Sequence, residues 1–138
     1  MKYNGVIQKK LSMLDDHIRR VQRRMSSVTI EEFRDDWVLR AMAERMVQVC
    51  AEIMIDVAER IISLEQAGPV ESAAAAIVKL HDLGVLASPD PYRAMVRMRN
   101  LIVHEYDSIA PAILYDAVTQ HTADFLSFKA EIDAASDG

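Results

Sequence analysis

The segment from residue 46 to residue 58 restricts the fold of this chain more than any other stretch. Its only polar side chains are Gln48, Glu52 and Asp56, which lie four residues apart. This spacing places them along one face of a helix, so the rest of the helix circumference is apolar and has to be buried. We therefore predict a central helix that is surrounded by other helices.

The composition also favours an all-helical fold. Hydrophobic residues make up 51% of the 138 residues, aromatic residues only 6%, and eight residues are Met. A core of this kind is aliphatic and rich in Met, which suits packed helices better than sheets built from aromatic strands. A chain of this length typically forms one domain, so we expect residues 1–138 to be a single all-α domain.

Apolar spacing and capping signals predict about five helices. The first contains a heptad seam of six apolar residues spaced alternately by four and three, namely Ile7, Leu11, Leu14, Ile18, Val21 and Met25. Such a seam makes this helix an element of a bundle or of a dimer. Thr29 and Glu32 form a capping box for the second helix, expected to reach Ala67 with a bend between residues 34 and 37. Three further helices, over residues 71–83, 92–104 and 111–132, would complete an up-and-down bundle.

The most reactive side chains gather between residues 99 and 106. Arg99 offers planar, permanently charged donors to a phosphate, and His104 carries an imidazole that can move a proton near neutral pH. This pair suits cleavage of a phosphodiester. Five residues of helix separate the two side chains by about 140°, so they would converge only through a loosened last turn or across a dimer. Alternatively, Arg99 forms an ion pair with a helix carboxylate and His104 caps the helix.

The polar side chains of the central helix need partners if they are buried. Arg45, Arg93 and Arg97 are the cations that we expect to pair with them. Two roles are then open for the row formed by Gln48, Glu52 and Asp56. It could lie behind Arg99 and His104 and orient their side chains, or it could lock one register of the bundle.

Several classes of site are missing from the sequence. It contains no glycine-rich phosphate loop, no paired cysteines, no zinc-binding histidine motif and no nucleophilic serine motif, so we expect neither a metal nor a cofactor.

Cys50 is the only cysteine, and no apolar run approaches the roughly 20 residues that cross a bilayer, which together predict a cytoplasmic protein without membrane contact. The net charge of −5 restricts a nucleic-acid substrate to a local basic patch, which we place on the first helix and on Arg93, Arg97 and Arg99.

The motif Arg-x4-His-x-Tyr is formed by Arg99, His104 and Tyr106, and Asn100 follows the Arg. Through this motif the chain resembles the HepT family of HEPN-domain toxins. The resemblance extends over most of the chain, from about residue 9 to residue 128, and includes the central segment that begins at Arg45. It implies a small all-helical homodimer that acts as a metal-independent endoribonuclease. It also implies a nucleotidyltransferase antitoxin of the MNT type, which adenylylates the Tyr of the motif.

The same resemblance assigns roles to the residues of the motif. Arg99 would hold the phosphate of an RNA substrate, His104 would act as the general acid or base, and Asn100 would support them. Tyr106 would be the residue that the antitoxin modifies. The competing hypothesis is a helical module without catalytic activity that binds a nucleotide or a partner loop and works together with a nucleotidyltransferase.

Overall fold

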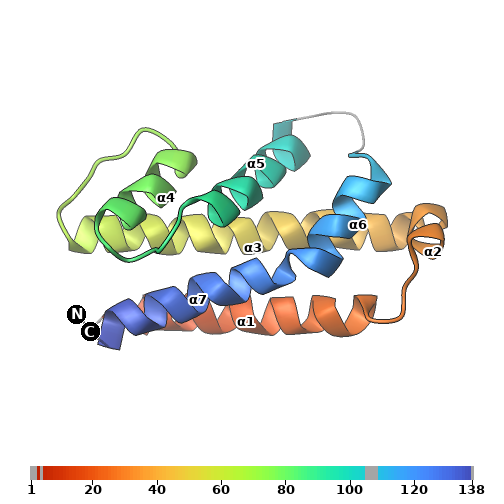
Figure 1. The fold of residues 1–138 in the computed structure, drawn as a ribbon, viewed down its shortest axis with the longest axis horizontal. Helices are drawn as coiled ribbons and strands as arrows, with labels where there is room; N and C mark the ends of the chain where they lie inside the picture. Colours follow the sequence, from red (N-terminus) through yellow and green to blue (C-terminus); the bar gives the residue numbers. More distant parts are fainter. Residues whose placement is uncertain (1–2, 4, 105–108, 138) are drawn as a thin grey trace.

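The computed structural model describes residue 3, residues 5–104 and residues 109–137, with only the backbone for residue 137. This part of the chain is all-helical (Figure 1). Its helices are α1 (Gly5–Met25), α2 (Ile30–Asp35), α3 (Trp37–Leu64), α4 (Ala73–Asp82), α5 (Asp90–His104), α6 (Pro111–Gln120) and α7 (Thr122–Asp137).

Helix α3 is the centre of the bundle, as predicted from its apolar circumference. It has 28 residues and packs against each of the other six helices of the described part. Successive long helices reverse direction: α1 and α5 run one way and α3 and α7 the other, with α1 and α7 on one side of α3 and α4 and α5 on the other (Figure 1). The up-and-down arrangement expected from the sequence is confirmed.

The heptad seam of α1 is buried within the chain itself. All six predicted residues are buried, and they contribute to two apolar clusters shared with α3 and with α6 or α7. The seam is therefore an element of the bundle core. Cys50 lies in the same core, where burial raises the pKa of its thiol to about 12.

Two of the five predicted helices are each divided in the structure, which gives seven. The expected bend near residues 34–37 is a complete break, because the carboxylate of Asp36 accepts hydrogen bonds from the backbone N–H groups of Val38 and Leu39 and so begins α3. The predicted N-cap of α2 is confirmed, since the hydroxyl of Thr29 accepts a hydrogen bond from the N–H of Glu32. The same hydroxyl donates a hydrogen bond to the carboxylate of Glu32.

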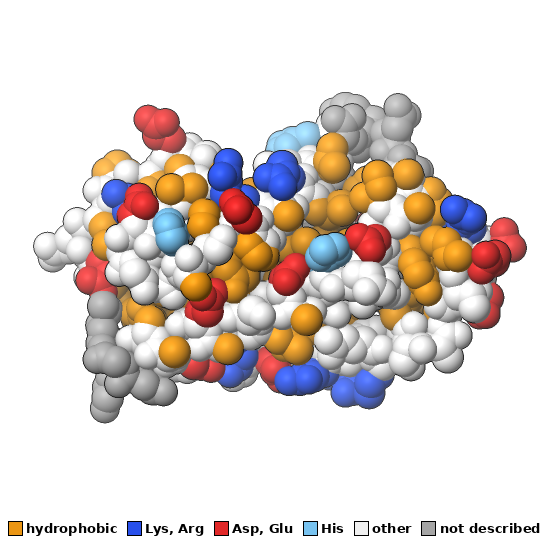
Figure 2. Space-filling model, viewed as in Figure 1, with side chains coloured by type: hydrophobic (Ala, Val, Ile, Leu, Met, Phe, Trp, Pro, Cys, Tyr) orange, Lys and Arg blue, Asp and Glu red, His pale blue; other side chains and the backbone are white. Residues whose placement is uncertain are grey.

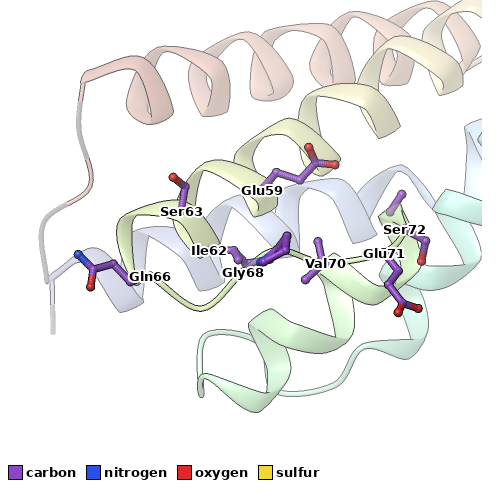
Figure 3. Close-up of a pocket in the computed structure, with 10 residues that line it drawn as sticks. Glu59, Ile62, Ser63, Gln66, Gly68, Val70, Glu71 and Ser72 are labelled. Atoms are coloured by element: carbon purple, nitrogen blue, oxygen red, sulfur yellow. The ribbon is translucent and has the colours of Figure 1, made fainter.

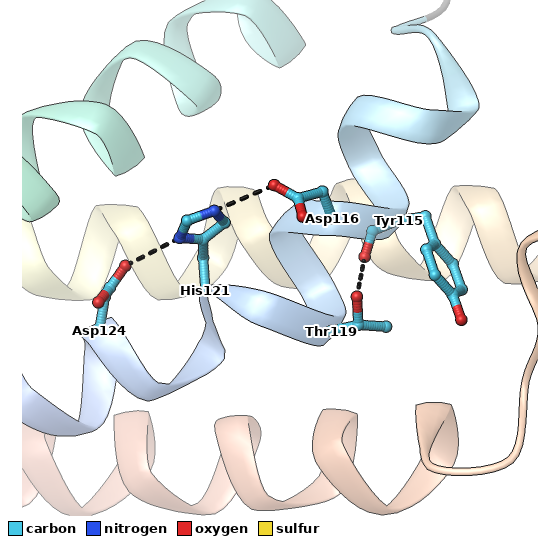
Figure 4. A network of polar contacts seen from close by, with 5 residues as sticks. All are labelled: Tyr115, Asp116, Thr119, His121 and Asp124. Atoms are coloured by element: carbon cyan, nitrogen blue, oxygen red, sulfur yellow. Dashed lines mark hydrogen bonds and ion pairs between the residues drawn. The ribbon is translucent and has the colours of Figure 1, made fainter.

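The second break, at His121, had no signal in the sequence analysis. Its imidazole lies 3.0 Å from a carboxylate oxygen of Asp116 in α6 and 3.2 Å from one of Asp124 in α7 (Figure 4). Thr122, the first residue of α7, is buried and its hydroxyl accepts a hydrogen bond from the amide of Gln22 in α1. These contacts hold the corner where the chain turns from α6 into α7.

Helix α5 spans both apolar clusters, and this positions its last turn. Tyr92, Met95 and Val96 are buried in the cluster formed by α1, α3, α4 and α7. Met98 and Ile102 pack against the second cluster, which includes α2, α6 and the beginning of α3. The last turn of α5 therefore lies over the first half of α3. No helix of the described residues is long and apolar enough to cross a membrane.

Candidate functional site

Arg99 lies on the side of α5 that faces the core. An α-helix turns by about 100° per residue, which places Arg99 between the directions of Met95 and Val96. Both of these residues are buried, whereas Arg99 is half-buried. Its Nε atom is buried and has no hydrogen-bond partner among the described residues. Buried polar atoms without partners are rare in proteins, and each one calls for a structural or functional explanation.

His104 is the last residue of α5 and its side chain is exposed. The predicted helix is present up to this residue, and residues 105–108 lie outside the described part of the chain. Because α5 stays helical up to His104, Arg99 and His104 point to sides of the helix about 140° apart. One copy of the chain thus presents an exposed imidazole and a half-buried guanidinium from different faces of α5, more than one turn apart.

Asn100 is exposed and lies one helical turn before His104, about 40° away around the axis. The two side chains therefore share a face, as a supporting role for Asn100 requires. Tyr106, the residue expected to be adenylylated, lies outside the described residues.

The polar side chains of α3 have partners other than those expected. The amide of Gln48 donates a hydrogen bond to Glu52, and Asp56 forms ion pairs with Lys10 of α1 at 2.7 Å and with Arg60 at 3.1 Å. Among the described residues, neither carboxylate pairs with Arg45, Arg93 or Arg97. The expectation failed because Glu52 is exposed and Asp56 only half-buried, so that water and the nearest cations satisfy them.

The contacts of Asp56 join α3 to α1. Partial burial alone raises the pKa of this carboxyl, but the hydrogen bonds and charges of Lys10 and Arg60 outweigh burial and hold the pKa below its ordinary value. These contacts fit the structural alternative of a register lock for this part of the polar row.

The basic residues of α1 are partly neutralised. Arg19 and Arg20 form ion pairs with Asp15 and Asp16, one turn earlier on the same helix. The basic surface predicted for the first helix is therefore weaker than its count of cations indicates.

Two other histidines of the described bundle, His81 and His121, have local partners. An imidazole nitrogen of His81 lies 2.9 Å from the carbonyl oxygen of Leu86, and His121 bridges two carboxylates (Figure 4). Among the described residues, no group of three or more His, Cys, Asp or Glu side chains could hold a metal ion.

The hollow shown in Figure 3 lies away from the motif. It has a volume of about 600 Å³ and lies between the last turns of α3 and the segment that leads into α4. Glu59 and Glu71 line it, while Arg99, Asn100 and His104 do not. Two carboxylates at its wall disfavour an anionic ligand such as a phosphate.

A contact that the sequence analysis missed connects α5 to α7. The hydroxyl of Tyr92 donates a hydrogen bond to the carboxylate of Glu131, whose other oxygen accepts one from the N–H of Ala87 at 2.8 Å. Burial of the hydroxyl, followed by the bond to Glu131, raises the pKa of Tyr92. The two residues are 39 positions apart, so neither local spacing nor a motif could indicate this contact.

Comparisons with known proteins agree with the fold and with the family resemblance. The mRNA nuclease HepT of Shewanella oneidensis is 28% identical over 127 residues, which cover 91% of this chain and 94% of that protein. A solved structure of the tri-AMPylated Shewanella oneidensis HEPN toxin in complex with its MNT antitoxin has a TM-score of 0.87 and 27% identity, covering 96% of this chain and 99% of that one.

A crystal structure of a toxin–antitoxin pair with AMP-PNP is similar as well, with a TM-score of 0.86 and 26% identity over 95% of this chain and 99% of that one. The HEPN-like helical fold implied by the resemblance is thus confirmed. The model of a family described as ribonuclease HepT-like matches residues 14–132, which is most of the chain. On this evidence, the protein belongs to the HepT-like ribonuclease family.

Proposed function

We propose that this protein is the toxin of a toxin–antitoxin pair and cleaves RNA without a metal ion, using Arg99 and His104. The observation that carries this proposal is the buried Nε of Arg99, which has no hydrogen-bond partner in the described part of the chain. A guanidinium with an unused donor in a partly dry environment is suited to bind a phosphate group more strongly than a fully hydrated one would. The relatives named above, an mRNA nuclease and toxins bound to antitoxins, support the same function.

We further propose that the site is completed by a second copy of the chain. Within one copy, Arg99 and His104 point about 140° apart, so a single strand of RNA would not contact both at one phosphate. Pairing two copies through the ends of α5 would let the Arg99 of one face the His104 of the other. Leu101 and Val103 are each 43% exposed and Ile113 is 51% exposed, and Figure 2 shows apolar side chains at the surface between α5 and α6. Burial of this apolar surface would favour the pairing.

In the proposed reaction, His104 takes the proton from the 2′-hydroxyl of a ribose, and that oxygen attacks the adjacent phosphorus. The new bond joins the 2′-oxygen to phosphorus, and the bond from phosphorus to the 5′-oxygen of the next nucleotide breaks. The departing 5′-oxygen receives a proton from a protonated imidazole or from water. Arg99 stabilises the negative charge that grows on the two non-bridging oxygens. The products are a 2′,3′-cyclic phosphate and a 5′-hydroxyl.

Control of this activity is proposed to act through Tyr106. An MNT-type nucleotidyltransferase would transfer adenylate to its hydroxyl, and the Shewanella oneidensis relative was solved in a tri-AMPylated form with such an antitoxin. An adenylate two residues after His104 would place a bulky anion beside the motif and repel the phosphate of a substrate.

The test is cleavage of cellular RNA by the purified, unmodified protein with a chelator present. We expect the native protein to cut RNA and to leave 2′,3′-cyclic phosphate ends, and we expect Arg99→Ala and His104→Ala to be inactive. His17→Ala is the matched control, because His17 is a histidine of α1 away from the motif. Cleavage retained by a folded His104→Ala protein would refute the assignment. Absence of cleavage by the native protein would favour the non-catalytic binding module.

Modification is tested separately by co-expression with the nucleotidyltransferase. The intact mass is expected to rise by whole adenylate units in the native protein but not in Tyr106→Phe. Tyr115→Phe serves as a control, since the hydroxyl of Tyr115 is occupied by a hydrogen bond to the carbonyl oxygen of Val28 at 2.6 Å. A mass increase that persists in Tyr106→Phe would show that another residue is modified.

A further inference from the structure

Four polar side chains of α5 form a straight row along its exposed face. Arg93, Arg97, Asn100 and His104 are spaced by four, three and four residues, which keeps them within a sector of about 60° around the helix axis. All four are exposed. Arg99 is not part of this row, because it faces the core. We call these four residues the α5 row.

The cations of the α5 row are not neutralised by the fold. Arg93 and Arg97 form no ion pair within the part of the chain that the structure describes, in contrast to Arg19 and Arg20 of α1. The acidic residue of α5, Asp90, precedes the row, and only polar, basic or apolar residues lie between Arg93 and His104. Figure 2 shows basic side chains and an imidazole over α5, with an acidic side chain next to them. Although the protein has a net charge of −5, the cations of the α5 row should therefore attract anions to this face of α5.

We infer that Arg93 and Arg97 bind the phosphates of a single RNA strand that leads along α5 to the scissile bond at His104. An α-helix rises 1.5 Å per residue, so Arg97 lies about 10 Å and Arg93 about 16 Å from His104 along the axis. A stacked strand advances about 3.4 Å per nucleotide. The two cations would therefore contact phosphates about three and five nucleotides from the cut, on the same side of it.

This inference rests on the proposed ribonuclease function, because it uses His104 to define the position of the cut. It predicts in addition that cleavage depends on the length of the RNA on one side of the cut. RNA with six nucleotides on the side bound by the α5 row should be cleaved with a lower KM than RNA with two. Binding that is equal in the ground state and the transition state changes KM and leaves kcat unaltered.

The test compares Arg93→Gln/Arg97→Gln with Arg19→Gln/Arg20→Gln. Both double variants remove two positive charges, so they alter the net charge equally. The probe is a fluorescent single strand of ten 2′-O-methyl nucleotides, which lacks the attacking hydroxyl and stays intact. Its affinity is measured by anisotropy over a series of KCl concentrations. Each phosphate contact contributes about 0.7 to the slope of log affinity against log salt for a single strand, so the α5 variant should lose about 1.4. The α1 variant should lose clearly less, because Arg19 and Arg20 are already paired with Asp15 and Asp16.

The outcomes separate this inference from the proposed function. A reduced slope for the α5 variant upholds the inference even if the native protein fails to cleave RNA, in which case only the nuclease function fails. Equal slopes for the two double variants would overturn the inference, and so would a native protein that does not bind the probe. If the α5 variant binds the probe normally but no longer binds the antitoxin, the row is a protein-docking surface and the inference is wrong. Melting curves by circular dichroism check that both variants are folded.

Discussion

Replacing Arg99 with Met is expected to stabilise the folded protein while abolishing cleavage of RNA. The Nε atom of Arg99 is buried and unpaired among the described residues, on the side of α5 that faces the core. A buried polar atom without a partner costs about 1 to 3 kcal/mol of stability. Met is a flexible, unbranched apolar side chain that can fill the space taken by the stem of Arg99. The substitution therefore removes a cost of folding together with a functional group.

The expected gain can be estimated from the burial of this side chain. Because Arg99 is half-buried, part of its side chain stays hydrated, and we expect the lower part of the range, about 1 to 2 kcal/mol. The unfolding entropy of about 2.1 cal/mol/K per residue gives about 0.29 kcal/mol/K for 138 residues. The midpoint of thermal unfolding should then rise by about 3 to 7 °C.

The assay is urea unfolding followed by circular dichroism, at one fixed protein concentration because dimerisation would contribute to stability. The fluorescence of Trp37 is a poor probe, since this side chain is 70% exposed in the folded protein. Arg97→Met is the matched control, because Arg97 is exposed on the same helix and its replacement should change stability by less than about 0.5 kcal/mol. A loss of stability in Arg99→Met beside a neutral Arg97→Met would refute the reasoning, because it would show that Arg99 makes stabilising contacts.

Three further predictions concern the scaffold. Tyr92→Phe should lower the free energy of unfolding by about 1.5 to 3 kcal/mol in urea titrations, because it removes a hydrogen bond to the carboxylate of Glu131. Because the pKa of Tyr92 is raised in the folded state, this tyrosine ionises at a lower pH in the unfolded chain than in the folded protein. The free energy of unfolding should therefore fall as the pH rises above about 10, and it should fall less in Tyr92→Phe. A double-mutant cycle on Lys10 and Asp56 should give a coupling below about 1 kcal/mol, which disappears in high salt and as the pH falls through the lowered pKa of Asp56. Cys50 should react with a thiol reagent at pH 8 only after unfolding, and rapid labelling of the native protein would contradict its burial.

Much of the bundle could be predicted because its signals are local. The alternating spacing of Ile7 to Met25 indicates one buried face whatever the helix packs against, and all six predicted residues are buried. The two extra breaks depend on single side chains. Asp36 ends α2 and caps α3, and His121 bridges the helices on either side of it. The sequence indicated only a bend at the first of these positions and nothing at the second, because a pattern averaged over many residues does not register single contacts.

The candidate site, too, could be predicted only in part from the sequence. The chemical types in the motif could be read directly, and so could the angle of about 140° between Arg99 and His104 on a helix. Whether Arg99 faces the core or the solvent depended on which side of α5 packs against α3, and the packing places it inward. The partners of Asp56 were predicted wrongly, because the proximity of Lys10 results from the pairing of α1 with α3.

By itself, the sequence determined that this chain forms a helical bundle around residues 46–58 and that its reactive groups follow one another at the end of one helix. Both properties follow from the repeat of a helix, which acts over neighbouring turns. Only the tertiary structure decided that Arg99 is partly buried with an Nε that has no partner among the described residues, and that Arg19 and Arg20 of α1 are paired. It also decided that Arg93 and Arg97 form no ion pair within the described part of the chain. These properties depend on burial and on distances between residues of different helices, which the packing of the whole chain sets.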